Sequence, residues 1–305
     1  MGSATLQYTI ASALFLAPLA VGSHALLESA RLALQEDAYT HIILILPISV
    51  ALIILEWRKR ICSPTKSPLA GSALLVVAIM VAVVALRWRS TESHPTDVIL
   101  SCEMLAIVIW WIGSFVACFG WRAFRLCLFP LLFLLLLVPL PRVAVNHTVE
   151  FLQLGTASCS RVLFTMIGIP ALQDGTVVKI PGLNLQVAQQ CSSIRSSMIL
   201  IVSTMVASYV LLRSVCYRAL VILVAVPLSI AKNGLRVVIL AVLGQYVDRR
   251  FLTGWLHHNG GPLFLALSLA VVFALIRFLL WMENRRLQPP LVTHLYSAAG
   301  HSAAD

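Results

Sequence analysis

Charged residues are scarce in this chain of 305 residues: only 11% are Asp, Glu, Lys or Arg, whereas 60% are hydrophobic. Because no soluble globule can hide so much apolar surface, this scarcity excludes an ordinary soluble domain. The sequence therefore predicts an all-α polytopic membrane protein. About eight apolar segments approach the roughly 20 residues that a membrane-spanning helix needs, namely 8–27, 41–57, 69–88, 98–118, 124–140, 196–212, 217–240 and 262–281.

Paired cysteine motifs are also missing. The seven cysteines are an odd number and none form a CxxC spacing, which argues against a disulfide framework and a structural zinc site. We expect no metal and no cofactor. Most of the cysteines lie in or beside apolar segments, where we expect them to pack as small apolar side chains; these are Cys102, Cys118, Cys127, Cys159 and Cys216. Cys62 lies in a basic loop.

The first apolar segment has no basic region before it and no small-residue cleavage site after it, so we expect a retained span. The net charge of +10 does not indicate nucleic-acid binding, because the basic residues are scattered among short loops. With eight alternating spans, one side receives Arg58, Lys59, Arg60, Lys66, Arg122, Arg125, Arg213, Arg218, Arg285 and Arg286. The positive-inside rule assigns that side, and both termini, to the cytoplasm.

This topology leaves residues 141–195 outside as the longest non-spanning region. The pattern from Asn146 to about Ile169 predicts an amphipathic helix that lies on the membrane surface. Residues 176–187, with a turn at Pro181-Gly182, predict a short β-hairpin.

Three polar fragments are expected at the same outer face. Cys191 precedes the sixth span, where the start of a helix favours a reactive thiolate. Arg236 comes roughly 29 Å along the seventh span, near the outer boundary. His257 lies just before the eighth span and is suited to proton transfer near neutral pH.

Each polar residue also has a structural interpretation. Arg195 either favours the thiolate of Cys191 or places its charge at the membrane surface. An ionised Arg236 in an apolar run either pairs or serves a site, and Asn233 lies on the same helical face to orient it. Glu103 either serves as a carboxylate partner at the site or forms a structural ion pair with Arg236 or Arg195. The histidines, including His258 and His147, are alternatively solvated loop or surface residues.

These fragments resemble the exosortase/archaeosortase family of membrane cysteine transpeptidases. The family pattern appears as Ala188-Gln-Gln-Cys191-Ser192-Ser193-Ile194-Arg195, then Asn233-Gly234-Leu235-Arg236, then His257-His258-Asn259-Gly260-Gly261. The resemblance covers about residues 95–280. It divides the chain into N-terminal helices (1–95) with little motif content, a catalytic core (96–282) and a cytoplasmic tail (283–305). Ser193 stands where the family has glycine, and this replacement could reduce or redirect activity.

The resemblance implies that Cys191 attacks a peptide bond in an exported protein and forms an acyl-thioester. Arg236 would stabilise the oxyanion and His257 would transfer protons; His257 is preferred to His258 because Gly261 follows it by four residues. Ser192, Arg195, Asn233, Gly261 and Glu103 are supporting or substrate-binding candidates. The implied partners are membrane lipid and exported proteins that end in a sorting motif such as Pro-Glu-Pro, a transmembrane helix and a basic tail. The implied location is the cell's inner membrane, with the site on its extracytoplasmic side.

Other functions remain open. A transporter or channel would use Arg236 and Glu103 along a substrate path, but no internal repeat is visible and the polar residues cluster toward one face. An assembly protein that retains the fold without catalysis is a second alternative, with Ser193 as its signature. A membrane acyl or glycosyl transferase is disfavoured because a dense acidic motif is lacking.

Overall fold

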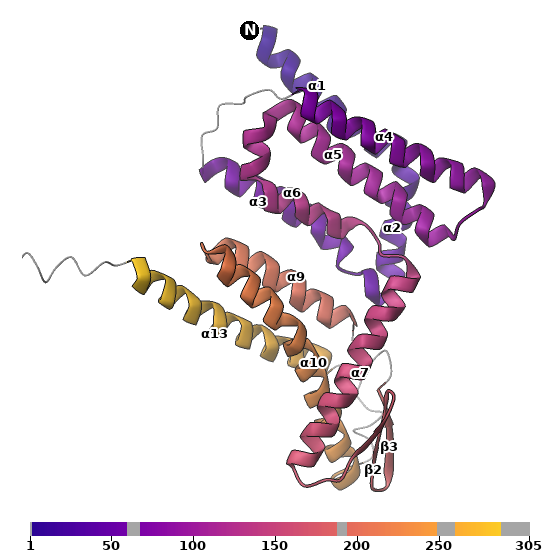
Figure 1. The fold of residues 1–305 in the computed structure, drawn as a ribbon, viewed down its shortest axis with the longest axis vertical. Helices are drawn as coiled ribbons and strands as arrows, with labels where there is room; N and C mark the ends of the chain where they lie inside the picture. The colour runs from indigo at the N-terminus through magenta and orange to yellow at the C-terminus, as the bar shows by residue number, and fades with distance from the viewer. Residues whose placement is uncertain (1, 60–67, 188–193, 249–259, 288–305) are drawn as a thin grey trace, which may run out of the picture. The chain divides into compact units, whose positions relative to one another are not determined.

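Helices dominate this protein, as the ribbon in Figure 1 shows. The computed structural model describes residues 2–59, 68–187, 194–248 and 260–287. The chain divides into two compact units, Met1–Glu150 and Phe151–Asp305. The boundary falls inside helix α7 (Arg142–Met166).

All regular secondary structure in the described residues of the first unit is helical. It contains α1 (Gly2–Val21), α2 (Ser23–Gln35), the 3-10 helix η1 (Asp37–Tyr39), α3 (Ile42–Lys59), α4 (Pro68–Thr91), α5 (Thr96–Leu126), α6 (Leu128–Phe133), the 3-10 helix η2 (Leu134–Leu137) and the start of α7. The second unit contains the rest of α7, strands β1 (Leu172–Asp174), β2 (Val177–Ile180) and β3 (Leu183–Gln186), and helices α9 (Ile194–Leu211), α10 (Val215–Tyr246) and α13 (Gly261–Leu287).

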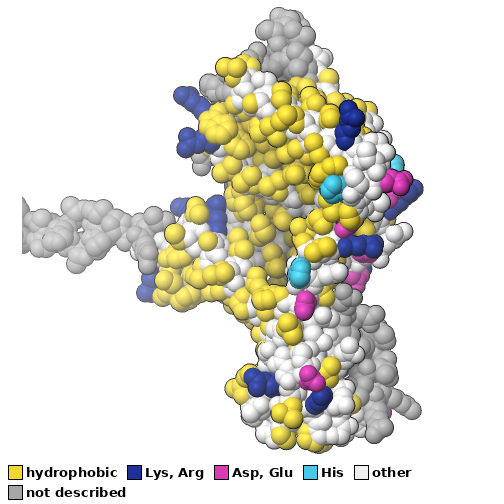
Figure 2. All heavy atoms as spheres, turned by 45° about the vertical axis from the view of Figure 1, so that its right-hand side comes forward, with side chains coloured by type: hydrophobic (Ala, Val, Ile, Leu, Met, Phe, Trp, Pro, Cys, Tyr) yellow, Lys and Arg dark blue, Asp and Glu magenta, His cyan; other side chains and the backbone are white. Residues whose placement is uncertain are grey.

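The all-α polytopic membrane fold is confirmed. Within the described parts of the chain, six helical segments are long and apolar enough to cross a bilayer, and two bent pairs raise the number to eight if each pair is one span. Many large apolar side chains on these segments are exposed, and apolar side chains cover wide areas of the face drawn in Figure 2. Such a surface is stable when it faces lipid rather than water.

The first predicted span is bent rather than straight. Helices α1 and α2 meet at 70° around Gly22. A side chain at this position would have its Cβ 2.7 Å from Ile107 Cδ1 and 2.8 Å from the Pro18 carbonyl oxygen. The absence of a side chain at Gly22 therefore allows the bend to pack directly against α5.

The fifth predicted span is a series of short segments. Helix α5 continues to Leu126 through a kink at Gly120, whose φ of 85° favours glycine, and α6 and η2 then reach only Leu137. Prolines 139 and 141 follow, and α7 leaves at 98°. Since proline has no backbone N–H and restricts the residue before it, these positions end the apolar helix.

Hydrogen bonds fix this turn within the first unit. The backbone N–H of Arg142 donates to Asp97 at 2.6 Å, the Tyr39 hydroxyl donates to the Leu140 carbonyl at 2.8 Å, and the Ser101 hydroxyl donates to the Pro139 carbonyl at 2.7 Å. The start of α7 is thereby held near the start of α5.

The predicted amphipathic helix and β-hairpin are both present. The helix is α7, and the hairpin consists of β2 and β3, with Val178 opposite Leu185 and Lys179 opposite Asn184. Strand β1 adds a third antiparallel strand that the sequence pattern did not indicate. The buried face of the sheet packs with residues of α7 and α10 in one core cluster, which contains Ala157, Phe164, Val178, Ile180, Val187, Val238 and Ala241.

Candidate functional site

Three helices of the second unit are fixed at one end by Glu283 of α13. Its carboxylate accepts hydrogen bonds from the backbone N–H groups of Ser214 at 2.7 Å and Arg213 at 3.2 Å, in the turn between α9 and α10. Glu283 is buried, and two main-chain donors compensate for much of the cost of burying its charge. The carboxyl-terminal part of α13 therefore lies at the α9–α10 turn.

Away from this turn, the start of α9 meets α10 before α10 ends, since α10 continues to Tyr246. Arg236 follows Ser214 by 22 residues, and Gly261 precedes Glu283 by 22 residues, so each is about 33 Å along its helix from the Glu283 contact. The amine of Lys232 on α10 donates a hydrogen bond to the hydroxyl of Ser196 in the first turn of α9. The start of α9, the start of α13 and the Lys232–Arg236 part of α10 thus meet at one end of this helical group (Figure 1).

Arg236 and Asn233 are buried side chains of this end. Their exposed fractions are 6% and 1%. The helix that carries them is packed closely on α7, because a Cβ at Gly234 would lie 2.9 Å from the Cys159 sulfur. The Ser160 hydroxyl on α7 also lies 3.4 Å from the Gly234 carbonyl. This contact fixes the rotation of α10 and therefore the face that carries both polar residues.

A second buried cation was missed in the sequence. Lys232 is 6% exposed and lies four residues before Arg236, so both cations share one face of α10. The sequence does contain a signal for this residue, since Lys232 is a charged residue in the same apolar run as Arg236 and is adjacent to Asn233. The Ser229 hydroxyl donates a hydrogen bond to the Ser197 hydroxyl at 2.6 Å. Ser196 and Ser197 carry no comparable signal in the sequence, because serines are common in apolar helices.

The other predicted site residues that the structure describes belong to both units. Arg195 is an exposed residue of the first turn of α9, and Gly261 is the first residue of α13. Among the described residues, no heavy atom lies within 4 Å of where a Gly261 Cβ would be, which leaves space beside this backbone. Glu103 belongs to the first unit, where its carboxylate accepts a hydrogen bond from Arg89 at 2.9 Å.

Cys191, Ser192 and His257 lie outside the described residues, as do Ser193 and His258. In sequence, Cys191 precedes Ile194, the first residue of α9, by three positions, and His257 precedes Gly261, the first residue of α13, by four.

This end can support acyl-transfer chemistry. Two buried cations on one helical face create a positive potential, which favours a thiolate and the oxyanion of a tetrahedral intermediate. Among the described residues, no group of three or more His, Cys, Asp and Glu side chains is arranged to hold a metal ion. The described side chains of the site therefore provide cations, hydroxyls and an amide.

In a comparison with protein-family models, the chain matches the transmembrane exosortase model over residues 33–274. The matched region contains every predicted site residue and begins within the N-terminal helices for which no motif was recognised. Comparisons with curated proteins and with solved structures give no significant match. Because the model covers most of the chain and the fold is that of a multi-pass membrane protein, this chain belongs to the transmembrane exosortase family of cysteine-type membrane transpeptidases.

Proposed function

We propose that this chain cleaves the carboxyl-terminal sorting signals of exported proteins through an acyl-thioester on Cys191. The observation that carries the proposal is the helix register set by Glu283 and Lys232. This register supports the proposal, because Arg236 lies toward the start of α9, which follows Cys191 in sequence, and α13 is the helix that follows His257. The three fragments are separated in sequence, and the proposal brings them to one end of one helical group.

In the proposed reaction, the Cys191 thiolate attacks the scissile carbonyl and the negative charge moves to the carbonyl oxygen. Arg236 donates hydrogen bonds to that oxyanion, and Asn233 helps to hold the guanidinium. Protonated His257 gives its proton to the departing amine, which leaves as the new amino terminus of the tail helix. A second nucleophile then attacks the thioester, His257 takes its proton, and the thiolate is restored.

The other candidate residues have proposed roles that follow from their positions in the chain. Arg195 is close in sequence to Cys191 and adds positive charge near the thiolate. Ser192 and Gly261 flank the reacting groups, and the open space beside Gly261 suits a substrate backbone. Glu103 is bound by Arg89, so we assign it to the structure of the first unit rather than to the reaction.

The proposed substrates are exported proteins that end in a short motif, a transmembrane helix and a basic tail. The loop charges favour a cytoplasmic location for both termini and for the α9–α10 turn. The site would then lie at the extracytoplasmic boundary of the inner membrane. A scissile bond just outside a substrate helix would reach it there.

The decisive experiment co-expresses the chain with a protein that carries such a signal and follows its length by immunoblot. Wild type should shorten the substrate, and Cys191→Ala should leave it at full length while reaching the same level in the membrane. His257→Ala should abolish shortening and His258→Ala should retain it. Equal shortening by wild type and Cys191→Ala would refute the nucleophile assignment.

A non-catalytic assembly role makes a different prediction. In that case neither wild type nor Cys191→Ala would process any signal, and Ser193→Gly would be the informative variant. Recovery of processing in Ser193→Gly would show that Ser193, rather than the rest of the site, prevents the reaction.

A further inference from the structure

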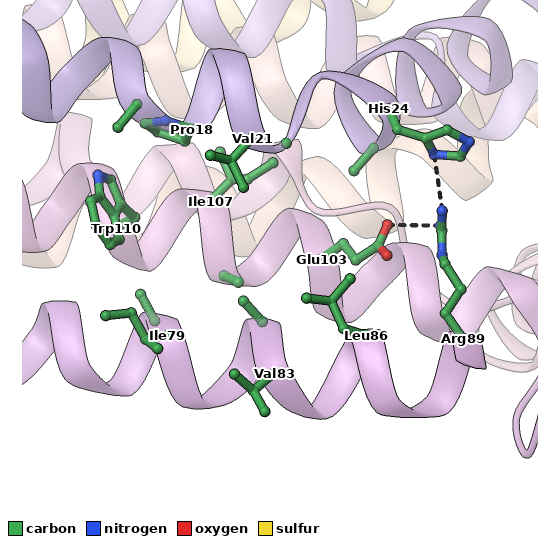
Figure 3. A pocket seen from close by; sticks show the side chains of 16 residues that line it. Pro18, Val21, His24, Ile79, Val83, Leu86, Arg89, Glu103, Ile107 and Trp110 are labelled. Carbon is green, nitrogen blue, oxygen red and sulfur yellow. Dashed lines mark hydrogen bonds and ion pairs between the residues drawn. The ribbon is translucent and has the colours of Figure 1, made fainter. Parts of the chain in front are cut away.

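The first unit contains an apolar groove that the proposed reaction does not use. It has a volume of about 400 Å³ and lies between the α1–α2 bend, α4 and α5 (Figure 3). Apart from His24, Arg89 and Glu103, its lining is apolar. Three of its lining residues on α4 are about half exposed: Ile79 (49%), Val83 (49%) and Leu86 (59%). The groove is therefore accessible from the apolar surroundings of α4.

One end of the groove is polar. Arg89 donates a hydrogen bond from Nη2 to Glu103 Oε2 at 2.9 Å and contacts His24 Nδ1 through Nη1 at 3.1 Å (Figure 3). Since the arginine can only donate, Nδ1 of His24 accepts, and the neutral ring carries its proton on Nε2. His24 thus retains a second donor. The polar end presents a cation, a carboxylate and an imidazole within one hydrogen-bonded group.

A larger polar hollow of about 1150 Å³ continues from this end and shares His24 and Arg89 with the groove. Its charged lining is balanced, with Arg31, Arg89 and Arg142 opposed by Glu28, Glu92 and Asp97. Helix α4 ends and α5 begins here, which is where a spanning helix reaches the membrane surface. An occupant should therefore have an apolar tail and a head with both signs of charge.

The dimensions distinguish a lipid chain from a protein helix. From Ala78 to Arg89 the groove follows α4 for about 16 Å, whereas one leaflet of the hydrocarbon core is about 15 Å thick. A transmembrane helix is about 30 Å long and at least about 10 Å wide, which corresponds to roughly 2,400 Å³. The groove is therefore the length of one acyl chain and much smaller than a substrate helix.

We propose that this groove binds one zwitterionic phospholipid, with an acyl chain between α1, α4 and α5, its phosphate at Arg89 and His24, and its ammonium toward the acidic side chains of the polar hollow. The balanced charge favours a zwitterion over an anionic lipid, because Arg89 is already paired with Glu103. The bound lipid would connect the α1–α2 bend to the α4–α5 pair.

Native mass spectrometry of the delipidated full-length protein in detergent, titrated with a phosphatidylethanolamine, tests this site. Two matched pairs of variants are available. Val83→Trp fills the groove, whereas Val84→Trp alters a neighbour on α4 that is 44% exposed and does not line it. Arg89→Gln removes the polar anchor, whereas Arg87→Gln removes an exposed charge from the same helix end.

We expect one tightly bound lipid in wild type, binding at least about tenfold weaker in Val83→Trp and Arg89→Gln, and binding within about twofold of wild type in the two controls. Equal weakening within either pair, or the absence of a bound lipid in wild type, would overturn the proposal. Equally tight binding of phosphatidylglycerol would overturn the zwitterionic assignment. Displacement of the lipid by an apolar 20-residue helical peptide would assign the groove to a protein segment instead.

Discussion

At the scale of single residues, the buried cations of α10 distinguish this membrane protein most clearly. Ionised side chains are costly inside a bilayer and are retained where they pair or act. Lys232 and Arg236 are separated by one helical turn, and the hydrogen bond from Lys232 to Ser196 connects that turn to α9. The site proposed around Arg236 therefore has a second positive group beside it.

Replacing Lys232 with Met should slow signal cleavage while leaving the protein folded. Loss of a buried cation lowers the positive potential at the oxyanion, and we expect a decrease of about 10- to 100-fold in the single-turnover rate. Lys232→Arg should recover part of that rate, and Ser196→Ala should lose less than Lys232→Met. An unchanged rate in Lys232→Met, with an unchanged unfolding temperature, would show that the charge of Lys232 does not contribute to the reaction.

Asp174 provides a pH-dependent contact at the edge of the sheet. Lys179 donates a hydrogen bond to it at 2.8 Å, and this neighbouring cation lowers the pKa of the Asp174 carboxyl. A carboxyl whose folded pKa is depressed stabilises the fold above its unfolded pKa, and this stabilisation is lost as the pH falls through the folded pKa. Asp174→Asn should therefore remove a small part of the acid sensitivity of thermal unfolding, because the pair is exposed to solvent. Identical acid sensitivity in both proteins would assign no stability to this pair.

At the scale of elements, the contact between α13 and the α9–α10 turn sets the register of the helical group. Glu283 accepts two main-chain hydrogen bonds there, and Arg218 donates two to the Leu212 carbonyl at 2.9 and 2.7 Å. These bonds satisfy backbone groups that a helix end leaves without partners. The contact lies at the opposite end from Arg236, so it acts on the site only through helix position.

Glu283→Ala should lower the free energy of unfolding by about 1–3 kcal/mol, since two main-chain donors lose a charged acceptor. Glu283→Gln should lose less, because its amide oxygen can still accept one bond. Thermal unfolding in detergent measures both, and Asn284→Ala, an exposed neighbour, is the control. If Glu283→Ala and Asn284→Ala unfold alike, α13 is held in register by apolar packing alone.

At the scale of the whole molecule, orientation in the membrane decides whether the proposed site meets exported proteins. The proposed orientation, based on the basic loops, has the α9–α10 turn, with the exposed Cys216, in the cytoplasm and Cys191 outside. In intact cells, a membrane-impermeant maleimide should label a variant that retains only Cys191 and should label a Cys216-only variant only after lysis. The reverse pattern would invert the topology and contradict the proposed function.

The sequence by itself determined the class of this protein. Apolar runs of membrane length, the amphipathic helix and the β2–β3 hairpin depend on local patterns, and all three occur in the structure. The ordered motifs around Cys191, Arg236 and His257 indicated the family that the comparison then established. A motif can be recognised from sequence because it consists of particular residue types at a fixed spacing.

Only the tertiary structure decided which distant residues meet. Glu103 pairs with Arg89, and Lys232 donates a hydrogen bond to Ser196. The bend after α1 and the groove beside Arg89 likewise depend on how helices pack. Hydropathy reports the preference of each segment for lipid, whereas ion pairs, bends and cavities depend on the approach of side chains far apart in the chain, which local composition does not encode.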